Sequence, residues 1–145
     1  MIVEVDVEIP FSAREVWRLA GGFDLLPSIS TGTTESKLED GGRVRVLTNS
    51  DRSILWERML AFNEAEMLLS YEITESDGFS SAYGVGYVGT VKVLENGDHK
   101  SIFRYTGDFE PTPGTTEEKA RAAVKAFAQD CAAGITTLLS RAQAP

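Results

Sequence analysis

Two oppositely charged residues, Arg45 and Glu57, have the spacing with the clearest chemical meaning in this sequence. The segment between them, Asn49–Ser53, has the composition of a hairpin loop. Pairing Leu47 with Leu55 across that hairpin places Arg45 directly opposite Glu57 on one face of a sheet. On an inner face the two would form an ion pair in a pocket, because charges are rarely buried without a partner. On an outer face they would be a surface pair contributing less than about 1 kcal/mol. The residues alone leave both faces open.

Other residue types used in catalysis are sparse. The only histidine, His99, follows an Asn96-Gly97 turn and is expected to be solvated, so no Ser-His or Cys-His arrangement is indicated. Cys131, the only cysteine, excludes an internal disulfide and is expected to be a small core residue. No residues have metal-ligand spacing, and residues 84–89 match G-x-G-x-x-G without the helix that a dinucleotide site needs. We therefore predict neither a metal site nor a cofactor.

The overall composition limits the partners. The chain has 145 residues, enough for one domain over 1–145 with a substantial core, and a formal net charge of -8. Nucleic acids and anionic membranes are bound by basic surfaces, so neither is an expected partner. The N-terminus lacks the features of a signal peptide, and no apolar run approaches the roughly 20 residues of a membrane span. With a single cysteine, these features predict a cytoplasmic protein without stable membrane insertion.

The surrounding sequence predicts an α+β fold. A half-buried strand is expected from Val3 to Ile9, where apolar and acidic residues alternate. A capping box of Ser12 and Glu15 begins a short helix, and a second short helix or turn follows at residues 24–28. Six antiparallel strands are then expected near 33–39, 43–49, 54–62, 67–76, 81–95 and 99–110.

A long amphipathic helix is predicted from about 116 to 141. Thr115 and Glu118 suggest a capping box at its start. Its apolar stripe consists of Ala120, Val124, Phe127, Cys131, Ile135 and Leu138. This is the only predicted element long enough to cover a whole face of the sheet.

This order of elements resembles the helix-grip superfamily, which includes birch-pollen-allergen-like proteins, START lipid carriers and polyketide cyclase/dehydrase proteins. Short motifs support the resemblance to the cyclase/dehydrase branch. Gly42-Arg-Val-Arg45 is similar to its G-x-x-R stretch, Glu57-Arg-Met-Leu60 to its E-R-L stretch and Ser70-Tyr-Glu-Ile73 to its s-Y-x-i stretch; Tyr83 and Tyr105-Thr-Gly-Asp-Phe109 stand at the expected distances. The family often has a tryptophan shortly after the first helix, where this chain has Leu25-Leu26-Pro27, so ligand identity does not carry over.

The resemblance implies a helix-grip fold: a seven-stranded antiparallel sheet curled around the C-terminal helix, with two short helices after the first strand. It also implies a cavity between sheet and helix that binds a small hydrophobic ligand of lipid, polyketide or aromatic type. The residues expected to line it are Arg45, Leu47, Leu55, Glu57, Met59, Tyr71, Ile73, Tyr83, Val85, Tyr87, Tyr105, Phe127 and Cys131.

Two other functions stay open. Glu57 as a general base and the tyrosines as hydrogen-bond donors would suit cyclisation or dehydration of a polyketide-like substrate. Without a histidine acid–base we rank binding above catalysis. An outward apolar patch would instead suit a homodimer; its residues would be Val44, Val46, Ile54 and Trp56.

The facing of the last strand is also open. Alternation directs Phe103, Tyr105 and Phe109 inward, whereas a two-residue turn at Asn96-Gly97 directs Arg104 inward instead. A β-bulge would reconcile the two, and we favour the aromatic residues inside.

Overall fold

The predicted elements occur in the predicted order in the computed structural model, which describes residues 1–143. The strands are β1 (Ile2–Ile9), β2 (Thr33–Glu39), β3 (Val44–Asn49), β4 (Ile54–Asn63), β5 (Leu68–Asp77), β6 (Val88–Glu95) and β7 (Ser101–Asp108). The helices are α1 (Ala13–Ala20), α2 (Leu26–Ile29) and α3 (Glu117–Ala142), with a 3₁₀ turn, η1 (Asp40–Gly42). No helix within residues 1–143 is long and apolar enough to cross a membrane.

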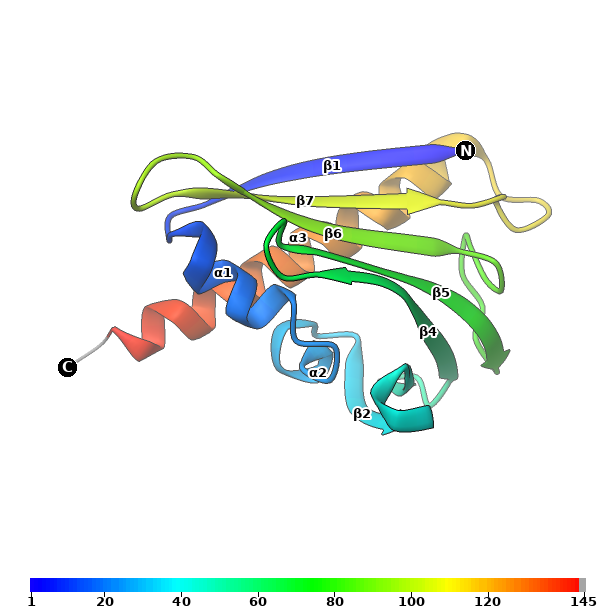
Figure 1. Cartoon of the computed structure of the whole chain (residues 1–145). Helices are drawn as coiled ribbons and strands as arrows, with labels where there is room; N and C mark the ends of the chain where they lie inside the picture. The colour runs from blue at the N-terminus through cyan, green and yellow to red at the C-terminus, as the bar shows by residue number, and fades with distance from the viewer. Residues whose placement is uncertain (144–145) are drawn as a thin grey trace.

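The strands form one antiparallel sheet in the order β1-β7-β6-β5-β4-β3-β2. The sheet bends around α3, and α1 and α2 lie on the same side (Figure 1). The backbone of α3 approaches β1, β7, α1 and α2 most closely, so it packs toward one edge of the curved sheet. The long helix therefore leaves space between itself and strands β3 to β5.

Side-chain caps fix the beginnings of α1 and α3. Ser12 Oγ accepts a hydrogen bond from the Glu15 backbone N–H at 3.2 Å, and Glu15 accepts one from the Ser12 N–H, as the capping box predicts. The capping box predicted for α3 is wrong by one residue. Its N-cap is Thr116, whose Oγ1 accepts from the Lys119 N–H at 3.2 Å, so the position three residues on is a lysine.

The strand predicted over 81–95 begins only at Val88, and residues 78–87 form a loop. Gly86 has a φ of +95°, a left-handed conformation that interrupts an extended strand. The loop is held at Ile73, which donates to the Tyr87 carbonyl and accepts from the Gly86 N–H, both at 2.9 Å. Val85 is 63% exposed on this loop, which contradicts its predicted inward position.

The last strand has its aromatic residues inside, as favoured. The predicted two-residue turn is wrong, because the Asn96 N–H donates to the Lys100 carbonyl and the connection is longer. This register pairs Tyr105 with Val91 and needs no bulge between β6 and β7. Arg104 points outward and binds Asp6 through Nε and Nη2 at 2.8 and 2.9 Å.

The apolar stripe of α3 forms the centre of the core. Its predicted members Ala120, Val124, Cys131 and Ile135 are at most 2% exposed, and Ala128 and Ala132 join them. Phe127 and Leu138 are half-buried. On the opposite face of the β3–β4 hairpin from Arg45, the predicted outward residues are half-buried (Val46, Ile54, Trp56) or buried (Val44). The homodimer through this face stays a prediction.

Helices α2 and α3 touch at Gly134. A methyl group at that position would overlap the backbone carbonyl of Ile29. Helix propensity alone would make Gly134→Ala stabilising by about 1 kcal/mol. We expect destabilisation of about 1–3 kcal/mol instead, because backbone cannot yield as a side chain can. Urea unfolding measures the sign, with Ala133→Gly at the neighbouring exposed position reporting the effect of propensity. Greater stability of Gly134→Ala would contradict this contact.

Candidate functional site

Arg45 and Glu57 form a buried ion pair on the inner face of the sheet. The register pairs Arg45 with Glu57 and Leu47 with Leu55, as predicted. Arg45 Nε donates to Glu57 Oε1 at 2.8 Å, and Nη2 lies 2.7 Å from the same oxygen. Each residue is only 4% exposed, so the inward interpretation is confirmed.

The remaining surface of the Arg45 guanidinium is also occupied. Nη1 donates to the Phe23 carbonyl oxygen at 3.1 Å. The guanidinium carbon lies 4.6 Å from the ring centroids of both Phe23 and Tyr71, within the range of cation–π attraction. The sequence did not indicate Phe23, which lies outside the predicted strands and contributes a main-chain oxygen.

The two members of the pair differ in how freely they titrate. Burial has the largest effect on the pKa of Glu57 and raises it above that of an ordinary carboxyl, while Arg45 acts in the opposite direction. Burial is also the largest single effect on Arg45 and acts to lower its pKa, but the attraction and hydrogen bond of Glu57, together with Tyr71 and Tyr105, outweigh it, so this pKa is raised. Arg45 is therefore always charged, and Glu57 is the member that can change its protonation state.

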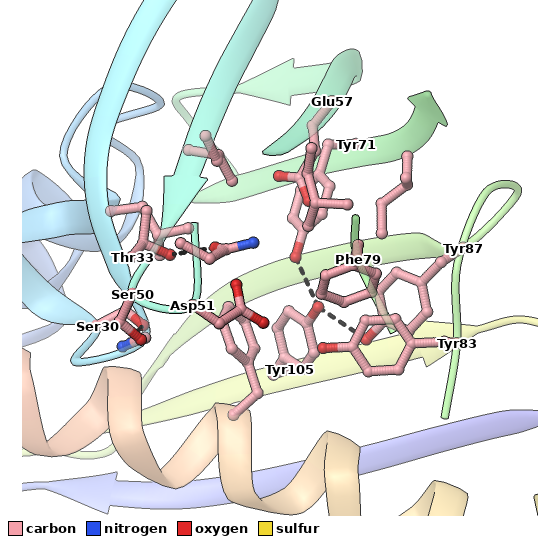
Figure 2. Close-up of a pocket in the computed structure, with 17 residues that line it drawn as sticks. Ser30, Thr33, Ser50, Asp51, Glu57, Tyr71, Phe79, Tyr83, Tyr87 and Tyr105 are labelled. Carbon is pink, nitrogen blue, oxygen red and sulfur yellow. Dashed lines mark hydrogen bonds between the residues drawn. The ribbon is translucent and has the colours of Figure 1, made fainter. Parts of the chain in front are cut away.

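Three tyrosines form a hydrogen-bonded cluster, which we call the tyrosine cluster: Tyr71, Tyr87 and Tyr105. The Tyr105 hydroxyl lies 2.6 Å from that of Tyr71 and 2.8 Å from that of Tyr87 (Figure 2). Burial is the main reason that the pKa of each of these three hydroxyls is raised, and it raises the pKa of Tyr83 to about 12. All four hydroxyls stay protonated at neutral pH and act as hydrogen-bond donors and acceptors.

Two paired glycines make room for the tyrosine cluster. Gly89 of β6 stands opposite Gly107 of β7. A Cβ atom on Gly89 would lie 2.5 Å from the Tyr71 hydroxyl oxygen, and one on Gly107 would lie 2.6 Å from that of Tyr87. The sequence drew attention to Gly89 as part of the G-x-G-x-x-G match, and Gly107 was not singled out. Their close approach to the hydroxyls of Tyr71 in β5 and Tyr87 in the preceding loop becomes visible only in the structure.

A cavity of about 240 Å³ lies between the sheet and α3. Its wall holds Glu57, the tyrosine cluster, Tyr83 and Phe127, and Figure 2 shows the aromatic rings gathered at one side. At its mouth the exposed Ser50 and Asp51 come from the β3–β4 loop. The cavity thus has an aromatic interior and a polar entrance.

Most of the predicted lining residues border this cavity; they are Leu47, Leu55, Glu57, Tyr71, Ile73, Tyr83, Tyr87, Tyr105 and Phe127. Arg45 and Cys131 border only a separate void of about 20 Å³. Met59 is half-buried and borders neither, and the exposed Val85 also borders neither. Gly32, Ser50 and Asp51 are exposed members of a set that the sequence prediction missed. The full set is Leu26, Ser30, Gly32, Thr33, Asn49, Ser50, Asp51 and Phe79.

The remaining reactive groups supply no nucleophile or metal site. Burial raises the pKa of the Cys131 thiol to about 12, so it is protonated at neutral pH. His99 is exposed and lies in the β6–β7 connection. Within residues 1–143, no three His, Cys, Asp or Glu side chains lie close enough together to hold a metal ion.

Comparison with known proteins identifies the family. A family model described as polyketide cyclase / dehydrase and lipid transport matches residues 1–143. The chain belongs to this family. No curated protein matched the chain.

Solved structures with the same fold are also similar to this chain. The protein XoxI from Bacillus cereus shares 28% identity and a TM-score of 0.87, with 99% of each chain covered. An uncharacterised protein from Bacillus thuringiensis shares 29% identity and a TM-score of 0.85, covering 97% of this chain and 99% of that one. A START superfamily protein from Mycobacterium smegmatis, at 12% identity, has a TM-score of 0.77 over 98% and 99% of the two chains. This member of the polyketide cyclase/dehydrase and lipid transport family therefore has the helix-grip fold.

Proposed function

We propose that this protein reversibly binds a small, ring-containing apolar molecule in the cavity between the sheet and α3. The aromatic wall of the cavity carries this proposal, because it offers ring faces with a few polar atoms at defined positions. The volume of about 240 Å³ is small beside the range of roughly 300–1,000 Å³ usual for ligand pockets, which favours a compact molecule over a long chain. The open mouth at the β3–β4 loop gives such a molecule a route in and out.

Phe127 provides the test of this site. Its ring centroid lies 5.2 Å from that of Tyr105, so Phe127 forms the α3 side of the cavity. Phe127→Trp should fill part of the cavity and weaken binding of the neutral fluorophore N-phenyl-1-naphthylamine roughly tenfold, or about 1.4 kcal/mol. Titration of the probe's own emission measures this effect. The free energy of unfolding of this variant should stay close to that of the wild type, since the Phe127 side chain is half-buried beside open space.

Phe62→Trp is the matched control. Phe62 is 47% exposed, packs on Trp17 and borders no part of the cavity, so its replacement should leave probe affinity unchanged. If the wild type fails to bind the probe, or if both variants weaken it equally, the binding proposal is wrong.

An enzymatic role is the second candidate. Glu57 borders the cavity, and the rise in its pKa caused by burial moves it toward the range of a general acid–base. The protonated tyrosines suit donation to a carbonyl or enolate oxygen of a polyketide-like substrate. We rank this role below binding because the residues that border the cavity include no histidine, lysine or thiol to share the proton transfers.

A further inference from the structure

The cavity lacks an available positive charge. Arg45 directs Nε and Nη2 to Glu57 and Nη1 to the Phe23 carbonyl, and two rings cover its faces. It borders the 20 Å³ void and not the cavity. None of the described residues that line the cavity is Lys, Arg or His, whereas Glu57 and Asp51 are both acidic. An anionic ligand group would therefore find no unpaired cation among these residues, because the charge of Arg45 is already balanced by Glu57.

Glu57 provides a free acceptor to the cavity. Arg45 Nε and Nη2 both approach Oε1, and nothing within residues 1–143 donates a hydrogen bond to Oε2. Oε2 is not sealed in the core, because the one enclosed side-chain polar atom without a partner in that part of the chain is Ser101 Oγ. Since Glu57 lines the cavity, Oε2 is the oxygen available to a ligand donor.

The tyrosine cluster provides a free donor. Its three hydroxyls carry three protons, and two hydrogen bonds join them, so one proton is left over whichever way the bonds run. All three tyrosines line the cavity (Figure 2). A hydrogen-bond acceptor on a ligand in the cavity can therefore accept a hydrogen bond from the hydroxyl that carries this proton. Glu57 and the tyrosine cluster thus contribute a free acceptor and a free donor to the cavity.

Building on the binding function proposed above, we infer that the ligand is a neutral hydroxylated ring compound. Its hydroxyl groups donate a hydrogen bond to Glu57 Oε2 and accept one from the tyrosine hydroxyl of the cluster whose proton is unpaired. A carbonyl or an ether only accepts, and would leave Oε2 without a donor in a desolvated site. A carboxylate, sulfate or phosphate accepts only and also finds no unpaired cation among the described lining residues. Neutral hydroxyl groups satisfy both the donor and the acceptor.

A series of naphthalene derivatives tests this inference on the unmodified protein. Isothermal titration at pH 7 compares 2-naphthol, 2-methoxynaphthalene, naphthalene and 2-naphthoate, which share one ring system. We expect 2-naphthol to bind at least about tenfold tighter than the methoxy compound and naphthalene, as one or two added hydrogen bonds imply. The carboxylate should bind most weakly.

The outcomes separate the two proposals. Equal affinity for the three neutral compounds, or tightest binding of 2-naphthoate, overturns the hydroxyl inference and leaves the binding function standing. Failure of all four compounds to bind overturns the binding function together with the inference.

Glu57→Gln locates the acceptor. The amide keeps an oxygen for Arg45 but presents an N–H donor in place of Oε2, so the preference for 2-naphthol over 2-methoxynaphthalene should fall to about twofold or less. Glu35→Gln, an exposed change with the same loss of charge, should retain the full preference. An undiminished preference in a folded Glu57→Gln protein would show that Glu57 does not accept a hydrogen bond from the ligand hydroxyl. The ligand series on the wild type stands even if this variant does not fold.

Discussion

Replacing Glu57 by alanine is expected to lower the free energy of unfolding by about 3–5 kcal/mol. Among residues 1–143, Glu57 supplies the one carboxylate in contact with Arg45, and both residues are 4% exposed. Arg45 cannot release its proton, so the variant must keep an uncompensated guanidinium in the core or expose it by disrupting the sheet. Urea unfolding at neutral pH, followed by circular dichroism, measures the loss.

The double variant Arg45→Met/Glu57→Leu is the control. Replacing a buried pair by apolar residues of similar size is often close to neutral, so this variant should be clearly more stable than Glu57→Ala. That comparison separates the charge left behind from the packing lost. A Glu57→Ala midpoint equal to that of the wild type would contradict the buried pair.

The ion pair could be predicted because it depends on a local structure. One hairpin sets the register of Arg45 and Glu57, and Asn49–Ser53 marks its loop in the sequence. The inner position of the pair was harder, since apolar residues alternate on both faces of the hairpin. Outward residues such as Trp56 are half-buried, so hydrophobic periodicity alone did not distinguish the two faces.

Features that depend on several distant segments were missed or misplaced. The Asn96-Gly97 pair suggested a tight turn, but the pairing of β6 with β7 and β7 with β1 selected a longer connection. The strand predicted from residue 81 is shorter because residues 78–87 form a loop with packed aromatic rings. The ring centroid of Tyr83 lies 4.2 Å from that of Tyr87 in the same loop and 5.9 Å from that of Phe109, which follows β7. The contact with Phe109 joins segments far apart in sequence, which periodicity does not report.

The role of Arg45 shows the same limit. The resemblance placed it among the ligand-binding residues, together with Glu57 on the inner face of the hairpin. The structure instead uses it to orient Glu57, with the Phe23 carbonyl and two rings completing its surroundings. Phe23 lies 22 residues away in the chain, and nothing in its local sequence indicates that its carbonyl accepts from Arg45.

Replacing Arg45 by methionine should make stability depend on pH in the opposite sense to ordinary acid unfolding. Burial raises the pKa of Glu57, and Arg45 is the group that opposes this rise. Without Arg45 the folded-state pKa of Glu57 moves further above the ordinary value of 4.5. A group whose pKa is raised by folding stabilises the folded state fully below its unfolded pKa, and that stability is lost as pH rises through the folded pKa.

Arg45→Met should therefore be close to the Arg45→Met/Glu57→Leu variant in stability near pH 4.5, where Glu57 is neutral in the folded state. Between that pH and the raised pKa it should lose up to about 1.4 kcal/mol per pH unit relative to the double variant, because one proton separates the two states. Urea midpoints from pH 4 to 8 for both proteins measure the difference, and carboxyls elsewhere in the chain cancel in the comparison. A constant difference across this range would show that Glu57 remains charged without Arg45. Oε2 would then reach solvent through the mouth of the cavity, and the carboxylate would not need its arginine partner to stay ionised.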